Sequence, residues 1–158
     1  MAVYRAEHPS YHRLPHVPAR PLAEAVVAPP PGFRLTTIGP IVEASDARHP
    51  QVVEYIGCYS NMPGDACAAI DVRVTDYPTS EWAAYALRGT PTAGFDGSAI
   101  GTEAVVTKYG PPVLEARTDP QARAVYWRSG TTVVHIRGWL VPMDDVIRAY
   151  VARYPSSR

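Results

Sequence analysis

The chain has 158 residues, 46% of them hydrophobic, and its 15 basic and 15 acidic residues give a formal charge of zero. This length and composition suit one domain with a sizeable hydrophobic core. The charge balance disfavours general binding of nucleic acid or of anionic membranes, because proteins of those classes usually carry a basic excess.

The sequence shows no targeting or membrane segment. It contains no apolar run near the ~18 residues that a transmembrane helix needs. Its first residues, Met-Ala-Val-Tyr-Arg-Ala-Glu-His-Pro, lack the apolar stretch of a secretory signal. We therefore expect either a cytoplasmic protein or one from which a signal or anchor has been removed.

The N-terminal part of the chain is rich in proline. Residues 1–31 contain seven prolines, at positions 9, 15, 18, 21, 29, 30 and 31. This spacing prevents a long helix and favours extended backbone, although Leu22–Ala28 could form a short helical turn or strand. We predict an extended arm over residues 1–31, followed by a folded domain over residues 32–158.

Three histidines of this arm, His8, His12 and His16, recur every four residues. On a continuous helix they would line up as metal ligands. Pro9 and Pro15 fall within the span and interrupt such a helix. We therefore expect a solvated arm and no metal site.

The first half of the domain reads as strands followed by a helix. The predicted strands are Phe33–Ile38 continued by Ile41–Ala44, then Gln51–Tyr59 and Ala66–Asp76. A helix is predicted over Thr79–Arg88, because Trp82, Ala83, Ala86 and Leu87 form one apolar stripe. Thr79 or Ser80 can cap it.

The two cysteines, Cys58 and Cys67, flank a predicted loop at Ser60–Asp65. Two cysteines are too few for a structural zinc site. A hairpin with this loop places Cys58 opposite Cys67, where a disulfide is geometrically reasonable. Two buried free thiols are the alternative. A disulfide would indicate an oxidising compartment.

The second half repeats the order of strands and then a helix. The predicted strands are Glu103–Lys108, Val113–Arg117, Ala122–Trp127 and Thr131–Gly138. A two-residue turn at Ser129-Gly130 would set Trp127 opposite Thr132. The closing helix, Met143–Tyr154, has apolar residues at helical spacing and two aspartates in its first turn.

These elements predict an α+β fold, with a single antiparallel sheet and both helices packed on one face. The stretches Asp71–Leu87 and Val133–Val151 share a plan of strand, proline, acidic first turn and helix. This shared plan suggests a duplicated βββα unit.

One face of the predicted C-terminal hairpin carries Tyr126, Arg128, His135 and Arg137. Such a group could bind a protein partner or an anionic or aromatic ligand. The alternative is the solvated face of an ordinary sheet. No nucleotide-binding, metalloprotease or hydrolase motif is present, so we expect no catalytic residues and no cofactor.

Three short segments carry a resemblance to known proteins: Val53-Glu54-Tyr55-Ile56-Gly57, Ile70–Tyr85, and Tyr126-Trp127-Arg128-Ser129-Gly130. In these segments the chain resembles uncharacterised bacterial exported domains of α+β type, over about Phe33–Tyr154. The resemblance favours the periplasm or cell envelope over the cytoplasm. It transfers no catalytic residues.

Three functions are compatible with these features. The first is a non-enzymatic accessory or structural subunit that binds a protein partner or assembly through its arm and sheet surface. The expected contact residues are Tyr4, Tyr11, Leu14, Val17, Tyr126, Arg128, His135 and Arg137. The second is a small-molecule or lipid-binding domain with a pocket lined by aromatic residues: Trp82, Tyr85, Trp127, Trp139 and Tyr150. The third is an enzyme with a site near His135.

Overall fold

The computed structural model describes residues 16–43, 50–64, 69–89, 103–117, 122–139 and 142–157. Its helices are α2 (Leu22–Ala25), α3 (Ser80–Gly89) and α4 (Asp144–Arg153). Its strands are β1 (Arg34–Glu43), β2 (Val52–Ser60), β3 (Ile70–Asp76), β4 (Glu103–Val106), β5 (Val113–Arg117), β6 (Ala122–Ser129) and β7 (Thr132–Trp139). These elements lie close to the predicted ones.

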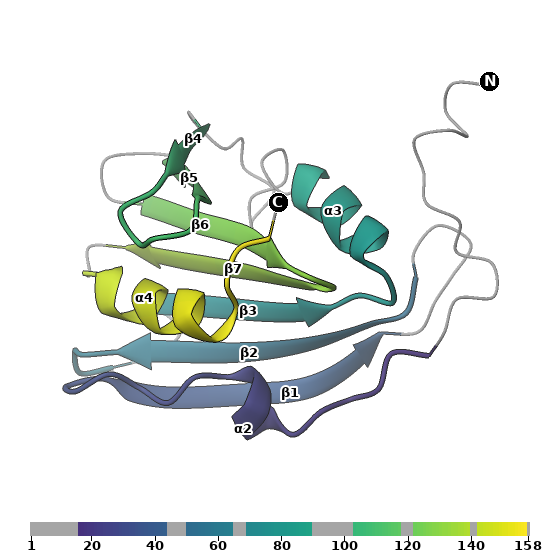
Figure 1. Ribbon diagram of the computed structural model, residues 1–158. Helices are drawn as coiled ribbons and strands as arrows, with labels where there is room; N and C mark the ends of the chain where they lie inside the picture. The colour runs from purple at the N-terminus through teal and green to yellow at the C-terminus, as the bar shows by residue number, and fades with distance from the viewer. Residues whose placement is uncertain are drawn as a thin grey trace.

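The strands form one seven-stranded antiparallel sheet in the order β1-β2-β3-β7-β6-β5-β4 (Figure 1). The two halves of the chain meet where β3 pairs with β7 at the centre of the sheet. In the described part of the chain β1 and β4 are therefore the edge strands. The prediction of an α+β fold with a single antiparallel sheet is confirmed.

One face of the sheet, here called the α4 face, carries the main hydrophobic core. Its buried side chains alternate along the central strands and include Tyr55, Tyr59, Val72, Val74, Val125, Trp127, Val134 and Ile136. Helix α4 packs its apolar stripe on this face, with Ile147 fully buried and Val151 5% exposed, as predicted. A Cβ at Gly138 would lie 2.6 Å from the Met143 sulfur, so the chain entering α4 touches the sheet backbone directly.

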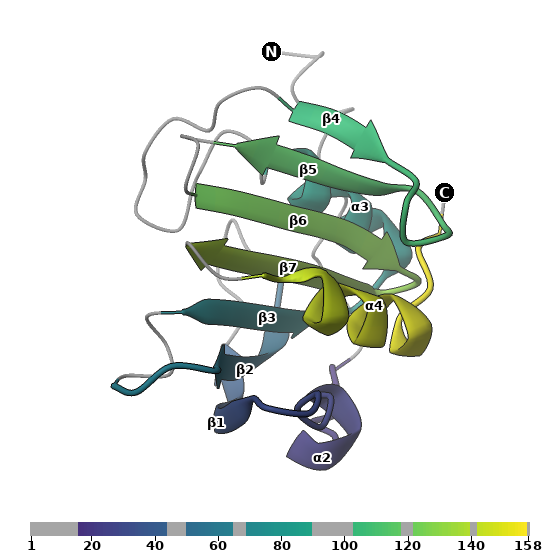
Figure 2. The same cartoon turned by 90° about the vertical axis from the view of Figure 1, so that its left-hand side faces the viewer.

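The opposite face, here called the α3 face, is covered by α3 over β6 and β7. Trp82 and Ala83 of α3 are buried, and so are Tyr126 and Val133 on this face of the sheet. The Thr79 side chain caps this helix, because the Trp82 N–H donates to its hydroxyl at 3.2 Å. Figures 1 and 2 together show α3 and α4 on opposite sides of the sheet.

The prediction that both helices pack on one face is therefore wrong in that detail. Periodicity identifies the apolar stripe of a helix, but not the face of the sheet that receives it, and both faces of β6 and β7 carry buried side chains. A two-fold rotation that relates antiparallel β3 and β7 would leave both helices on the same face. The two halves are therefore not a symmetric βββα repeat.

Both predicted hairpin registers are shifted. In the β6–β7 hairpin Trp127 pairs with Val134 rather than Thr132, and the turn is formed by Gly130 and Thr131. The shift of two positions leaves each side chain on its predicted face, since side chains alternate with a period of two.

In the β2–β3 hairpin Cys58 pairs with Asp71, not with Cys67, because pairing with β2 resumes only at Ile70. Cys58 is 1% exposed and disulfide-bonded. Its predicted partner, Cys67, lies outside the described residues.

The described part of the predicted arm belongs to the domain. Val17, Ala25 and Val26 are part of the main core, so a domain boundary at Pro31 is not supported, and Val17 is not available to a partner. A short extended segment cannot bury its own core, but it can pack on aromatic residues of the sheet and α4. The predicted contact residues Tyr4, Tyr11 and Leu14 lie outside the described residues.

Candidate functional site

The predicted hairpin cluster exists but is not an open binding surface. Tyr126 is fully buried, and its ring lies edge-on to the ring of His135 with centroids 5.7 Å apart. Arg128 donates to the Gly130 carbonyl at 3.1 Å. The cluster therefore brings Tyr126, His135 and Arg137 onto adjoining strands, without presenting them together to solvent.

His135 is neutral at pH 7. Burial, together with the nearby positive charges of Arg137 and Arg73, lowers the pKa of its imidazole to about 3. An imidazole of this kind supplies no positive charge to an anionic ligand near neutral pH.

Opposite charges lie next to this histidine on the α3 face. Arg137 Nη2 lies 3.8 Å from Asp71 Oδ2, and Arg73 Nη1 lies 3.5 Å from Glu54 Oε1. Burial raises the pKa of both carboxyl groups, and the arginines oppose that rise. Arg137 is among the site residues predicted from the sequence, but the other three charged residues are not, although the alternation along β3 puts Asp71 and Arg73 on one face.

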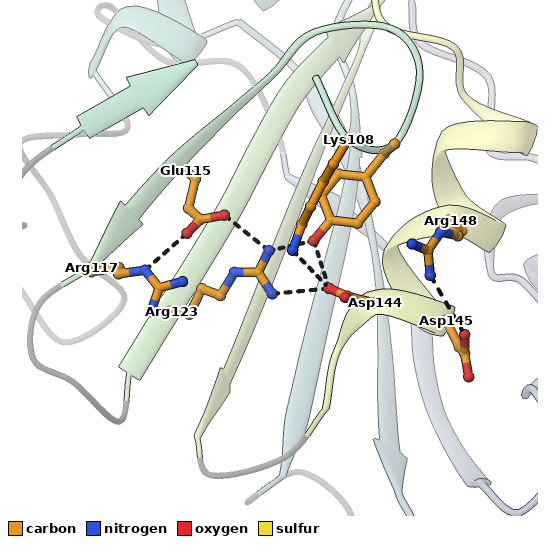
Figure 3. A network of polar contacts seen from close by, with 8 residues as sticks. Lys108, Glu115, Arg117, Arg123, Asp144, Asp145 and Arg148 are labelled. Atoms are coloured by element: carbon orange, nitrogen blue, oxygen red, sulfur yellow. Dashed lines mark hydrogen bonds and ion pairs between the residues drawn. The ribbon is translucent and has the colours of Figure 1, made fainter. Parts of the chain in front are cut away.

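A second polar network lies on the other side of the molecule, where β5 and β6 meet the start of α4 (Figure 3). Arg123 is at its centre: Nη2 donates to Glu115 Oε2 at 2.9 Å and Nη1 to Asp144 Oδ1 at 3.1 Å. The Tyr109 hydroxyl accepts from Arg123 and donates to Asp144 Oδ1 at 2.7 Å. Lys108 also pairs with Asp144, at 3.5 Å.

The electrostatics of this network are those of a structural anchor. The hydrogen bond from Tyr109 and the bonds and charges of Arg123 and Lys108 lower the pKa of Asp144 to about 2. Burial of Glu115 opposes a similar change, but hydrogen bonds from Arg123 and Arg117 lower its pKa. Both carboxylates are ionised and paired with cations at neutral pH, which does not suit them to general acid catalysis. Their contacts hold the first turn of α4 against β5 and β6.

A third constellation holds the strap, defined here as residues 17–27, on the α4 face. It consists of tyrosines from β2 and α4 and from the residue after α4: Tyr55, Tyr59, Tyr150 and Tyr154. We call this set the tyrosine groove. At one end the Tyr59 hydroxyl donates to the Val27 carbonyl at 2.5 Å, and the Tyr150 hydroxyl accepts from the Val27 N–H at 3.2 Å.

The rest of the tyrosine groove also contacts the strap backbone. The Tyr154 hydroxyl donates to the Ala25 carbonyl at 2.7 Å. The Tyr55 hydroxyl donates to the Arg20 carbonyl at 3.0 Å and accepts from the Arg20 N–H at 2.7 Å. Because these bonds reach main-chain atoms, they depend little on which side chains the strap carries.

Arg20 is the principal side-chain anchor of the strap. Its guanidinium binds both oxygens of Asp76 at 2.9 Å and lies 5.6 and 5.3 Å from the ring centroids of Tyr55 and Tyr154. The Thr132 hydroxyl donates to the same carboxylate at 2.7 Å. This site was not predicted from the sequence, because no local pattern indicates that residues 56 positions apart will pair.

Exposed apolar side chains gather on the edge strand β1. Ile38, Ile41 and Val42 are 48%, 36% and 51% exposed, and we call them the β1 edge patch. Ile38 and Ile41 lie on the α3 face, where α3 does not reach them, and Val42 lies on the α4 face. From sequence this segment is indistinguishable from a buried strand, because its apolar residues resemble those of the core strands.

The aromatic residues of the predicted ligand pocket do not share a cavity. Trp82 and Tyr85 lie on α3, with ring centroids 5.6 Å apart, whereas Trp127 and Tyr150 lie in the core of the α4 face. The side chain of Trp139 lies outside the described residues. A separate hollow of about 360 Å³ opens near β4, lined in part by Leu87, Val105, Leu114 and Trp127.

Within the described residues, no three histidine, cysteine or acidic side chains gather where they could hold a metal ion. His16 is exposed, and His8 and His12 lie outside the described part. None of the described helices is both long and apolar enough to span a membrane.

No known protein indicates what these sites do, so their chemistry has to be read from the residues themselves. Comparison with protein-family models, curated proteins and solved structures found no match to this chain. The resemblance to exported α+β domains therefore stays a prediction from sequence.

Proposed function

We propose that this chain is a non-enzymatic accessory subunit that binds a protein partner at the β1 edge patch. The observation that carries the proposal is the exposure of Ile38 and Ile41 on one face of the edge strand, with Val42 exposed on its other face; all three are more than a third exposed. Exposed apolar side chains that lie together on a monomer surface commonly mark a site of protein association.

The charges around the patch support a protein partner. Arg34 and Glu43 stand at opposite ends of β1, and Arg34 is already bonded to the carbonyls of Met62 and Gly64. An apolar centre with a polar rim of both signs is the usual arrangement of a protein interface.

The backbone of β1 indicates how such a partner docks. Pro40 has no N–H to donate, and the pairing with β2 shifts register between Ile38 and Ile41. These features oppose the addition of a continuous strand along the edge. We therefore expect the partner to contact the apolar side chains rather than extend the sheet.

A photo-crosslinking amino acid placed at position 38 in the source cells would test this interface. A matched probe at Val105, which is 65% exposed on the other edge strand, serves as the control. The proposal expects a discrete crosslinked protein from position 38 and none from position 105. The purified partner should then bind wild type, and Ile41→Lys should weaken that binding about tenfold or more, since interface anchors contribute ~1–2 kcal/mol or more.

Equal crosslinking from both positions would contradict the proposal. So would a purified partner whose dissociation constant is the same for wild type and Ile41→Lys. Val105→Lys carries the same added charge on the opposite edge and should leave the affinity unchanged.

Binding of a small apolar molecule or lipid is a second candidate function. The hollow near β4 favours it, because its volume falls in the range of ligand pockets and its lining is largely apolar. Lauric acid should then raise the melting temperature of wild type but not of Leu114→Lys, which places a charge in the hollow. If both proteins respond alike, this function is not supported.

A further inference from the structure

The strap and its groove have the chemistry of proline-rich peptide recognition. The strap contains Pro18 and Pro21 and is extended apart from the four residues of α2. Its groove is lined by tyrosine rings whose hydroxyls bond to peptide N–H and C=O groups. Aromatic-lined grooves that bond to the backbone of a pre-extended segment are a recurring mode of peptide binding, and here the bound segment belongs to the chain itself.

The connection from the strap to β1 depends on one reversal. Pro29, Pro30 and Pro31 come directly after Ala28 and each favours extended backbone. The chain turns back at Gly32, whose φ is +86°, and the Phe33 N–H donates to the Pro30 carbonyl at 3.1 Å. These residue types and this φ fit a type II turn, which needs glycine at its third position.

Because the segment before β1 is rigid and extended and reverses only at Gly32, this turn can act as a hinge between two conformations. With the Gly32 turn closed, the strap folds onto its own groove. With the turn open, the prolines hold the strap away from its own sheet and toward another molecule. Every strap contact could then form between two chains without change, so the two states differ mainly at the hinge.

We propose that the tyrosine groove also accepts the strap of a second copy of this chain, giving a strap-exchanged dimer. The strap of the second copy has the same sequence as the chain's own strap, so it can adopt the same backbone conformation. Its Arg20 can bind Asp76, and its valines can fill the same places in the core. The β1 edge patch plays no part in this exchange, so the inference stands apart from the proposed function.

The test uses strain at the hinge. Gly32→Ala should open the turn, because a non-glycine residue with positive φ costs ~1–2 kcal/mol, which is about a five- to thirty-fold change per hinge in the monomer–dimer equilibrium. Gly110→Ala is the matched control, since Gly110 has a φ of +103° in another turn and equally open surroundings. Size-exclusion chromatography with light scattering after refolding at high protein concentration gives the dimer fraction. The fraction should rise for Gly32→Ala and stay at the wild-type value for Gly110→Ala.

A disulfide crosslinking experiment identifies the interface of the dimer. A Cβ at Gly57 would lie 2.9 Å from Val26 Cγ1, so cysteines at these two positions meet only when strap and groove are docked. Chains carrying Val26→Cys alone and Gly57→Cys alone are refolded together and oxidised. A covalent heterodimer that forms with this mixture, and not when either chain is mixed with wild type, supports the exchange.

Two outcomes would overturn the proposal. One is a Gly32→Ala protein that folds and stays monomeric at every concentration. The other is a dimer that Ile38→Lys abolishes, because such a dimer forms through the β1 edge patch. If Gly57→Cys does not fold, the dimer fractions of Gly32→Ala and Gly32→Ala/Ile38→Lys still decide between these interpretations.

Discussion

The two faces of the sheet differ in how they are packed and in the polar side chains that they carry. The α4 face carries the main apolar core, which α4 and the strap close with hydrogen bonds from tyrosines to main-chain atoms, and also the ion pairs that Arg20 and Arg123 make with Asp76 and Glu115. The α3 face carries charged pairs and the neutral imidazole of His135, and α3 covers it over β6 and β7. We infer that the α4 face supplies most of the folding free energy, whereas the α3 face adds a pH dependence of stability that comes from a neutral histidine.

The largest effect should come from removing the strap. Deletion of residues 1–31 takes Val17 and Val26 out of the core, and each buried valine contributes ~1.5–3 kcal/mol. The deletion also removes Arg20 and leaves the carboxylate of Asp76 without that partner. We expect a loss of at least about 4 kcal/mol relative to a chain lacking only residues 1–15, measured by urea denaturation. This expectation differs from the prediction from sequence, in which residues 1–31 form an arm outside the folded domain.

Equal stability of the two truncated chains would show that the strap contributes little. The larger contribution of the α4 face to the folding free energy would then have to come from α4 without the strap.

A cavity beneath α4 should have the next largest effect. Ile147 is fully buried, so Ile147→Ala should lower the free energy of unfolding by about 2–5 kcal/mol through lost burial and an unfilled space. Leu87→Ala on α3 is the comparison, because Leu87 is only partly buried and should cost less. Thermal unfolding followed by circular dichroism measures both. If Leu87→Ala proved the more damaging change, the main core would be misassigned.

Arg20→Ala tests the ion pair that anchors the strap. The guanidinium makes two hydrogen bonds to Asp76, whose side chain is 12% exposed, and hydrogen bonds to charged groups contribute ~1.5–3 kcal/mol each. Because the Arg20 side chain is 27% exposed, solvent screens part of this interaction. We therefore expect Arg20→Ala to lower the free energy of unfolding by about 2 kcal/mol. Arg117→Ala, which removes a 59% exposed partner of Glu115, should cost no more than about 1 kcal/mol. Similar losses in urea denaturation would show that burial does not distinguish the two pairs.

Local patterns predicted the elements, and long-range contacts determined what the patterns could not. Helical periodicity placed Ile147 and Val151 in the core, and strand alternation put Val125 and Trp127 on one face. The same alternation cannot separate a core strand from the β1 edge patch, because burial depends on which strands come to lie alongside. The tyrosine groove was missed for a related reason: a tyrosine hydroxyl carries no sequence signal for the carbonyl that it will reach, as between Tyr154 and Ala25.

The smallest expected change in stability at neutral pH concerns His135 on the α3 face, which affects the free energy of unfolding through its protonation. An unfolded histidine binds a proton near pH 6.5, whereas the folded imidazole does so only near pH 3 because of burial and the charges of Arg137 and Arg73. Between these values the unfolded state holds more protons, so this residue makes the free energy of unfolding fall as the pH drops from about 6.5 to about 3.

His135→Gln, which stays uncharged beside Tyr126, should remove this dependence. Denaturant unfolding at several pH values should therefore show wild type losing more stability than the variant between pH 6.5 and pH 4, with the two differing by a constant amount above pH 7. Carboxyl groups such as Asp144 also titrate in acid, but they are present in both proteins and cancel in the difference. Parallel curves over the whole range would mean that the folded imidazole takes up its proton as readily as the unfolded one. The α3 face would then contribute no pH dependence of stability through this residue.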